Sequence, residues 1–242
     1  MSILHSGGRS VLEGLSYGPA FGEPSLDALV RRTEPACGHT PRFGGRGGLP
    51  VLEGAGQVVR DLVHEDARSL FESLATPEVA RFTVDPPGSP QGFERFIDWT
   101  HEQRASGLYA CFAIVPREIG QAVGLIQIRQ RVSNEGTAEW GFAIGSRFWG
   151  TGLFIEGATL VVDFAFREMG VHRLEARSLV NNGRANGALR KLGAEREGVL
   201  RRAFERRGEY HDESMWALIR EEPADPKVRL ASSWADISRL PS

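Results

Sequence analysis

The chain has 242 residues, of which 41% are hydrophobic and 25% are charged, as in an ordinary globular protein. Its net charge of −2 gives no basis for binding to nucleic acid or to an acidic membrane surface. Two cysteines, Cys37 and Cys111, are too few for a disulfide framework, and no histidine clusters with them at metal-ligand spacing.

The N-terminus has no basic segment followed by an apolar core, and no apolar run is long enough to span a bilayer. We therefore expect a cytoplasmic protein. Residues 1–48 are rich in glycine and proline and are predicted to form an extension without a core, in which 25–32 offer a short helix. A partner-binding tail is the alternative for this stretch. One globular domain is expected over 49–220, followed by a polar tail at 221–242.

The first half of the domain is predicted to contain one strand and two helices. Residues 57–62 have the pattern of a strand, and 64–74 place apolar side chains on one helical face. Residues 77–90 are predicted to be a loop or short helix. Ser89 and Pro90 have the residue types that open a second helix.

The second half is predicted to be richer in strands. Strands are expected at 110–116, 122–130, 137–144 and 174–179, and a long amphipathic helix at 153–169. A short helix at 185–192 should stop at Gly193, and a closing hairpin should pair 199–204 with 210–219 through Arg207 and Gly208.

The loop between strand 137–144 and the long helix contains Arg147-x-x-Gly150-x-Gly152. Glycines let the backbone approach a ligand closely, and the first amides of a helix attract an anion. An arginine adds a permanent charge suited to phosphate. The loop is therefore predicted to hold a pyrophosphate; the alternative is a turn that binds nothing. The P-loop and dinucleotide glycine patterns are both absent, which disfavours a nucleotide binder of another fold.

This loop resembles the coenzyme A pyrophosphate loop of the GNAT acyltransferase superfamily, and 149–156 are similar to its RimJ/RimL-like branch, the ribosomal-protein-alanine N-acetyltransferases. Asn182, eleven residues before Gly193, and the run 208–212 match further motifs in the same order. The resemblance covers about 50–219. It implies an α/β (α+β) GNAT fold, with a mixed, mostly antiparallel twisted sheet, helices on both faces and a splayed central strand pair.

The resemblance also implies an activity, namely transfer of an acetyl group from acetyl-CoA to a primary amine by direct attack on the thioester. The amine would belong to a protein N-terminus or to a small molecule. A weakly active or inactive CoA-binding regulatory module is the alternative. The expected partners are an acyl-CoA and an amine acceptor, without metal, nucleic acid or membrane, and a homodimer is left open.

The resemblance assigns CoA binding to residues of the strand, the loop and the start of the short helix: Phe142, Ala143, Ile144, Arg147, Gly150, Thr151, Gly152, Leu153 and Asn182. Glu139 is the candidate general base, directly or through water, and would need burial to raise its pKa. A structural strand carboxylate is the alternative for Glu139. For Asn182 the alternative is a helix cap.

The chain departs from many relatives at two positions near the expected leaving thiolate. Ala185 and Leu189 stand where those enzymes have serine and tyrosine, and neither can donate a proton. The general acid is thus unassigned, with Tyr210 and water as candidates. His211 and Asp212 are expected to be a polar pair at the hairpin edge, with substrate contact as the alternative.

Overall fold

The computed structural model describes residues 47–131 and 136–220 of the chain. The short helix expected at 25–32 and the tail expected at 221–242 lie outside these ranges. Within the described residues, no helix is both long and apolar enough to cross a bilayer.

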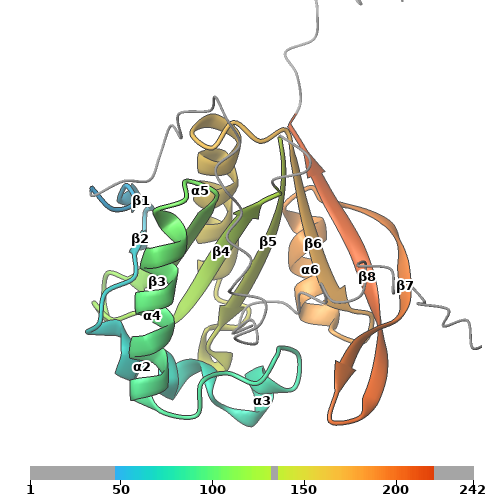
Figure 1. Ribbon diagram of the computed structural model, residues 1–242, viewed down its shortest axis with the longest axis horizontal. Coiled ribbons are helices and arrows are strands. Elements are labelled where there is room, and N and C mark those ends of the chain that lie inside the picture. Colours follow the sequence, from blue (N-terminus) through green and yellow to red (C-terminus); the bar gives the residue numbers. More distant parts are fainter. Residues whose placement is uncertain (1–46, 132–135, 221–242) are drawn as a thin grey trace, which may run out of the picture.

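The strands of the described residues form a single eight-stranded sheet. Their bounds are Leu52–Glu53 (β1), Gln57–Asp61 (β2), Tyr109–Pro116 (β3), Gly124–Gln130 (β4), Thr137–Ile144 (β5), Arg173–Leu179 (β6), Glu195–Arg206 (β7) and Glu209–Ile219 (β8). The order across the sheet is β1-β2-β3-β4-β5-β6-β8-β7 (Figure 1). The pair β5–β6 is parallel and the other neighbouring pairs are antiparallel.

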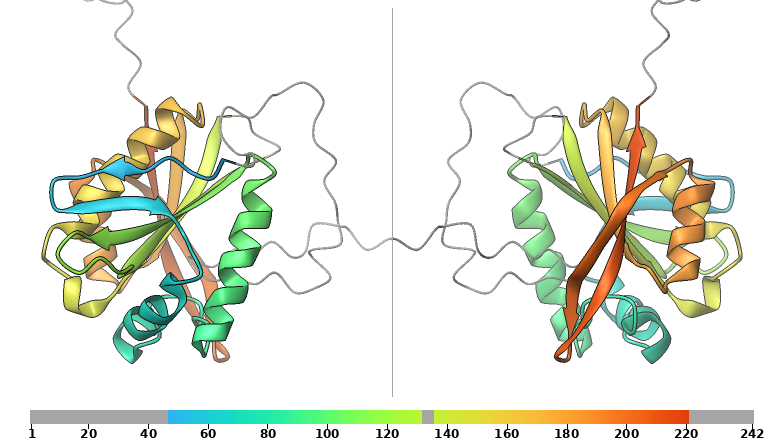
Figure 2. Two further views of the ribbon diagram at one scale, coloured as in Figure 1. Left: turned by 90° about the vertical axis from the view of Figure 1, so that its left-hand side faces the viewer. Right: turned by 90° about the vertical axis from the view of Figure 1, so that its right-hand side faces the viewer.

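Helices cover both faces of this sheet. They are α2 (Asp66–Leu74), α3 (Pro77–Ala80), α4 (Pro90–Arg104), α5 (Leu153–Arg167) and α6 (Gly183–Lys191), with a 3-10 turn η1 (Ser146–Phe148) before α5. Figure 2 shows α4 on one side of the sheet and α5 on the other. The predicted fold class is therefore confirmed.

Side chains along the central strands alternate between the two faces of the sheet, and each face therefore has its own hydrophobic core. All of β3 is buried, and its successive side chains point to opposite faces. Phe112 joins the core under α5, where its ring meets Phe164 edge-on at 5.1 Å between centroids. Cys111 and Ala113 join the core under α2 and α4, together with Leu70. Cys111 is buried there and acts as a small apolar residue.

The parallel pair β5–β6 opens partway along its length. The two strands are paired only where Thr137–Glu139 face Arg173–Glu175. Beyond that point β5 continues to Ile144 and β6 to Leu179 without pairing to each other, while each keeps its other neighbour. The sheet thus has a gap at its middle, as expected of a splayed central pair.

Local signals in the sequence set several element ends. The Ser89 hydroxyl accepts a hydrogen bond from the amide of Gly92 and caps α4. Gly193 adopts φ +87 directly after α6, which suits a helix stop. The closing hairpin turns at Arg207 and Gly208, both with positive φ.

The observed hairpin differs from the prediction in that β7 is longer and irregular. Its pairing with β8 shifts register between Leu200 and Phe204, where Arg202 has φ 52. The amide of Arg202 donates to the Asp212 carboxylate at 2.8 Å. Asp212 therefore stabilises the bulge, which supports the polar-pair interpretation of His211 and Asp212.

Glu156, in the first turn of α5, packs against the β1–β2 turn. Its carboxylate accepts hydrogen bonds from the amides of Ala55 and Gly56 and from the side-chain amide of Gln57. Gln57 is fully buried and also donates to the carbonyl of Leu153 at 2.7 Å. These contacts fasten the β1–β2 turn to the start of α5.

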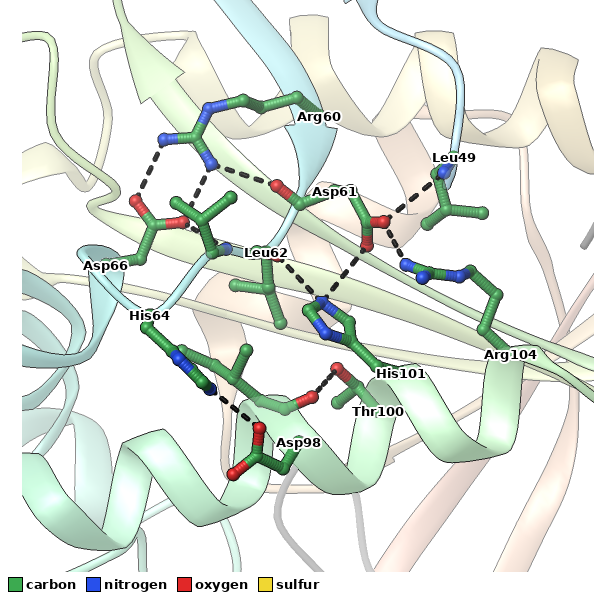
Figure 3. Close-up of polar contacts among 12 residues, drawn as sticks. Leu49, Arg60, Asp61, Leu62, His64, Asp66, Asp98, Thr100, His101 and Arg104 are labelled. Atoms are coloured by element: carbon green, nitrogen blue, oxygen red, sulfur yellow. Dashed lines mark hydrogen bonds and ion pairs between the residues drawn. The ribbon is translucent and has the colours of Figure 1, made fainter. Parts of the chain in front are cut away.

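A polar network fixes α2 and α4 to the end of β2 (Figure 3). Arg60 makes a bidentate pair with Asp66 at 2.7 and 2.9 Å. The Asp61 carboxylate accepts from Arg104, and His101 Nε2 lies 3.9 Å from its second oxygen. Because Arg104 and His101 belong to α4 and Asp66 to α2, the network fixes both helices over one face of the sheet.

Candidate active site

The loop that joins β5 to α5 is shaped by its own side chains and glycines. The Trp149 indole donates to the carbonyl of Ile144 at 3.1 Å and ties the loop to the end of β5. Gly150 and Gly152 have φ +78 and +92, a conformation that L residues rarely adopt. A Cβ built at either glycine would meet no protein atom within 4 Å. The surface above the loop is therefore open.

A cavity of about 420 Å³ lies against this loop. Its walls come from the unpaired end of β5, the start of α5, one face of α6 and the segment after α3. The position matches the gap between β5 and β6, because the β5 residues that line it, Phe142, Ala143 and Ile144, all follow the last paired residue, Glu139.

Several features of the cavity fit a coenzyme A-like ligand. The first turn of α5 begins at its edge, and helical amides there lack intrahelical partners and favour an anion. The buried hydroxyl of Thr83 lines the cavity and has no hydrogen-bond partner among the described residues. Phe142 and Phe154 give one wall an aromatic surface, with ring centroids 4.3 Å apart.

Most of the residues predicted to bind CoA meet at this cavity. Phe142, Ala143, Ile144, Gly150, Gly152 and Asn182 line it. Thr151 and Leu153 are not among the lining residues, but they belong to the same loop. The Thr151 hydroxyl donates to the carbonyl of Phe148 at 2.8 Å and accepts from the amide of Leu153 at 3.4 Å.

Arg147 is placed elsewhere. It lines a second cavity, of about 500 Å³, formed by the C-terminal part of α2, the β3–β4 turn and η1. The guanidinium of Arg147, which was predicted to contact the pyrophosphate, is thus on the other side of the loop from the cavity that Gly150 and Gly152 line.

Two cations that sequence reasoning missed line the first cavity instead. Arg184 and Lys191 come from the first and last turns of α6. The Arg184 guanidinium lies 4.7 Å from the centroid of the Trp149 ring, a cation–π contact. Ala188 lies between them at the spacing of one helical face, and that i, i+4, i+7 pattern is the signal that could have identified both.

Asn182 both caps α6 and lines the cavity. Its side-chain oxygen accepts from the amide of Ala185 at 3.1 Å, so the helix-cap interpretation is confirmed, and the residue also lines the cavity. Ala185 lines the cavity too, whereas Leu189 is fully buried in the core. Tyr210 is 54% exposed on the hairpin and stacks under Arg202, away from the lining residues.

Glu139 is not among the residues that line the cavity; it lies on the same face of β5 as Ala143, which packs into the core under α2 and α4. It is half-buried at the last paired position of β5, opposite Arg129 on β4 and Glu175 on β6. Burial raises the pKa of its carboxyl, and Arg177 opposes that rise more than any other charge. The burial that a glutamate base requires is therefore present.

The splayed parallel pair and the glycine loop before α5 define an acyltransferase fold. Residues 58–195 match the family model described as "Acetyltransferase (GNAT) domain". The chain belongs to the GNAT acetyltransferase family. With relatives named as N-acetyltransferases, it is an N-acetyltransferase of that family.

Relatives confirm the resemblance to the RimJ/RimL-like branch. The chain is 26% identical over 167 residues to the uncharacterized N-acetyltransferase p20 of Bacillus licheniformis, covering 69% of this chain and 94% of that protein. It is 25% identical over 130 residues to the [ribosomal protein uS5]-alanine N-acetyltransferase of Escherichia coli strain K12, covering 53% and 67%.

Solved structures show the same fold. RimL, the ribosomal L7/L12 alpha-N-protein acetyltransferase in complex with coenzyme A, superposes with a TM-score of 0.65 at 16% identity, covering 71% of this chain and 98% of that one. The ribosomal-protein-S5-alanine acetyltransferase of Vibrio fischeri gives 0.64 at 18% identity, covering 72% and 98%.

Proposed function

We propose that the protein transfers an acetyl group from acetyl-CoA to a primary amine by direct attack on the thioester. The observation that carries this proposal is the position of the first cavity. It joins the unpaired edge of β5 to the first turn of α5, so a single extended ligand can contact both. Family membership and the CoA complex of RimL support the same donor.

In this proposal the donor is held by backbone along one side and by charge at one end. Phe142, Ala143 and Ile144 have no partner on the β6 side, so the backbone groups that neither β4 nor the Trp149 indole engages are available to the pantetheine arm. The amides from Gly150 to Leu153 face the pyrophosphate. Arg184 and Lys191 add positive charge on the opposite wall.

Glu139 is the proposed general base, and its position requires a water molecule. Ala143 is the residue on the same face of β5 that lines the cavity. Glu139 precedes it by four residues, which is about 13 Å along a strand. A glutamate side chain cannot span that distance, so the proton of the acceptor amine would reach the carboxylate through ordered water. The raised pKa brings the carboxyl closer to the working pH, which favours this role.

The leaving thiol is expected to depart without a dedicated acid. A thiol has a pKa of about 8.5, so its thiolate is a tolerable leaving group near neutral pH. The methyl group of Ala185 at the cavity wall supplies no proton. Water is the proposed donor, because Tyr210 lies on the exposed hairpin.

The acceptor is proposed to be a protein N-terminus or a small amine, and the relatives that act on ribosomal-protein alanine support the first class.

We further propose a cytoplasmic protein whose catalytic domain occupies 49–220, with 1–48 and 221–242 outside it. The match over 58–195 supports these boundaries. A homodimer is left open.

A thiol-release assay tests the proposal. Purified protein is mixed with acetyl-CoA and a panel of acceptors that includes alanine-terminated peptides and small primary amines. Acceptor-dependent thiol release, with acetylated acceptor detected by mass spectrometry, is expected for at least one class. CoA binding without acceptor-dependent release across the whole panel would contradict turnover.

A further inference from the structure

Three charged residues form a diagonal across the opening between β5 and β6, on the face covered by α2 and α4. Glu139 pairs with Glu175, and Arg177 follows Glu175 by two residues on the same face of β6. Glu213 pairs with Leu179 and so lies one further step along, on β8. The strand register therefore places Arg177 between the two carboxylates.

The third member of this diagonal, Glu213, is a buried carboxylate whose burial is not balanced by a full set of hydrogen bonds among the described residues. Glu213 is 2% exposed, and its Oε1 has no hydrogen-bond partner among the described residues. The Nε atom of Arg177 is likewise buried without a partner there. Leaving such groups unpaired in a protein interior is costly, and the exceptions concentrate at functional sites.

The other charged groups around Glu139 have contacts of their own. On β4, Arg131 lies 3.3 Å from the Glu175 carboxylate on β6. Arg129, also on β4, lies over the ring of Tyr109 on β3, 5.4 Å from its centroid. Arg177 is thus the cation that the geometry leaves between Glu139 and Glu213.

The two carboxylates respond to the same cation. Burial raises the pKa of Glu139 and also that of Glu213, and Arg177 is the main charge opposing the rise in each. The Glu139 charge raises the pKa of Glu213 further. The two carboxylates therefore interact with the same guanidinium, and we expect their titrations to be coupled.

We propose that Glu213 is a positioning residue for acetyl transfer: by competing for the guanidinium of Arg177, its carboxylate keeps Glu139 free to accept a proton. The inference rests on the proposed function, in which Glu139 is the base. Without the Glu213 charge, Arg177 would interact with Glu139 alone and stabilise its ionised form. Glu139 would then be a weaker base.

The charge coupling can be measured without any turnover. Carbon-13 NMR of protein labelled at the glutamate carboxyls gives the titration midpoint of Glu139, assigned with Glu139→Gln. In Glu213→Gln this midpoint should fall by about half a pH unit or more. In Arg177→Met it should rise, and in that background Glu213→Gln should have a smaller effect. A midpoint in Glu213→Gln equal to that of the wild type would overturn the proposal.

A control variant and a reciprocal measurement complete the design. Glu209→Gln makes the same chemical change at an exposed position of β8 and should leave the Glu139 midpoint unchanged. If Glu213→Gln does not fold, the reciprocal measurement decides. The Glu213 midpoint must fall in Glu139→Gln, because coupling between two sites is mutual; an unchanged midpoint would refute the coupling.

The kinetic measurement connects the coupling to the reaction. The acid limb of the kcat/KM profile in Glu213→Gln should move to lower pH by the same amount as the NMR midpoint, with a lower plateau. A shifted midpoint with an unmoved acid limb would refute the base role of Glu139 while leaving the charge coupling intact. The two failures are therefore distinguishable.

Discussion

Replacement of Gly152 by valine should separate the binding function of the loop from its contribution to stability. Gly152 has φ +92 and lines the first cavity, and a Cβ there would meet no protein atom. The added side chain would therefore occupy ligand space above the loop amides. Gly170 offers a matched control, because it has φ +71, similarly open surroundings, and a position just after α5, away from the lining residues.

The two substitutions should cost the same in stability and differ in binding. An L residue forced into the left-handed region costs about 1–2 kcal/mol. For a chain of this size that lowers the Tm by about 2–8 °C in both variants. Blocking one charge-assisted hydrogen bond to the pyrophosphate adds a loss of about 1.5–3 kcal/mol in Gly152→Val alone. CoA affinity should then fall by about tenfold to a hundredfold.

Isothermal titration calorimetry with CoA measures the binding difference, and thermal unfolding of the free proteins measures the stability difference. Wild-type CoA affinity in Gly152→Val, or an equal loss in Gly170→Val, would refute the assignment of the loop. A similar Tm in the two variants is needed for the comparison to be valid.

Four further predictions concern the base, the cations and a helix cap. Glu139→Gln should lower turnover by about tenfold to several thousandfold with CoA affinity nearly unchanged, because glutamine cannot accept the proton; equal turnover at saturating acceptor would make Glu139 structural. The acid limb of the wild-type profile should lie above the ordinary glutamate range, since a base acts when deprotonated and burial raises the pKa of Glu139. Arg184→Ala should weaken CoA binding more than Arg147→Ala in calorimetry, because Arg184 lines the first cavity and Arg147 the second; the reverse order would indicate a rearranged loop. Ser89→Ala should destabilise the protein by about 1 kcal/mol in denaturant unfolding without affecting CoA affinity, because it removes only the cap of α4.

Much of the fold was predictable because its signals are local. The alternation of residues 137–144 and the 3.6 periodicity of 153–169 correspond closely to β5 and α5. Ser89 and Asn182 cap helices within three residues of their own positions, so residue type and spacing were sufficient. The positive φ values of Gly150 and Gly152 follow from the same kind of signal.

The features that could not be predicted depend on contacts between distant parts of the chain. Glu156 bonds to a turn about one hundred residues earlier, which helical periodicity cannot reveal. Arg147 belongs to the expected motif, but the three-dimensional path of η1 turns it toward α2. The relation between Glu139 and Glu213 requires the β5–β6–β8 register, because the two residues are far apart in sequence.

A crystal structure of the protein with bound CoA tests the central claim most directly. The pyrophosphate should lie within hydrogen-bond distance of the amides from Gly150 to Leu153, and the pantetheine arm should follow Phe142 to Ile144 in the opening between β5 and β6. CoA bound in the second cavity beside Arg147, or outside the opening altogether, would contradict the proposed site.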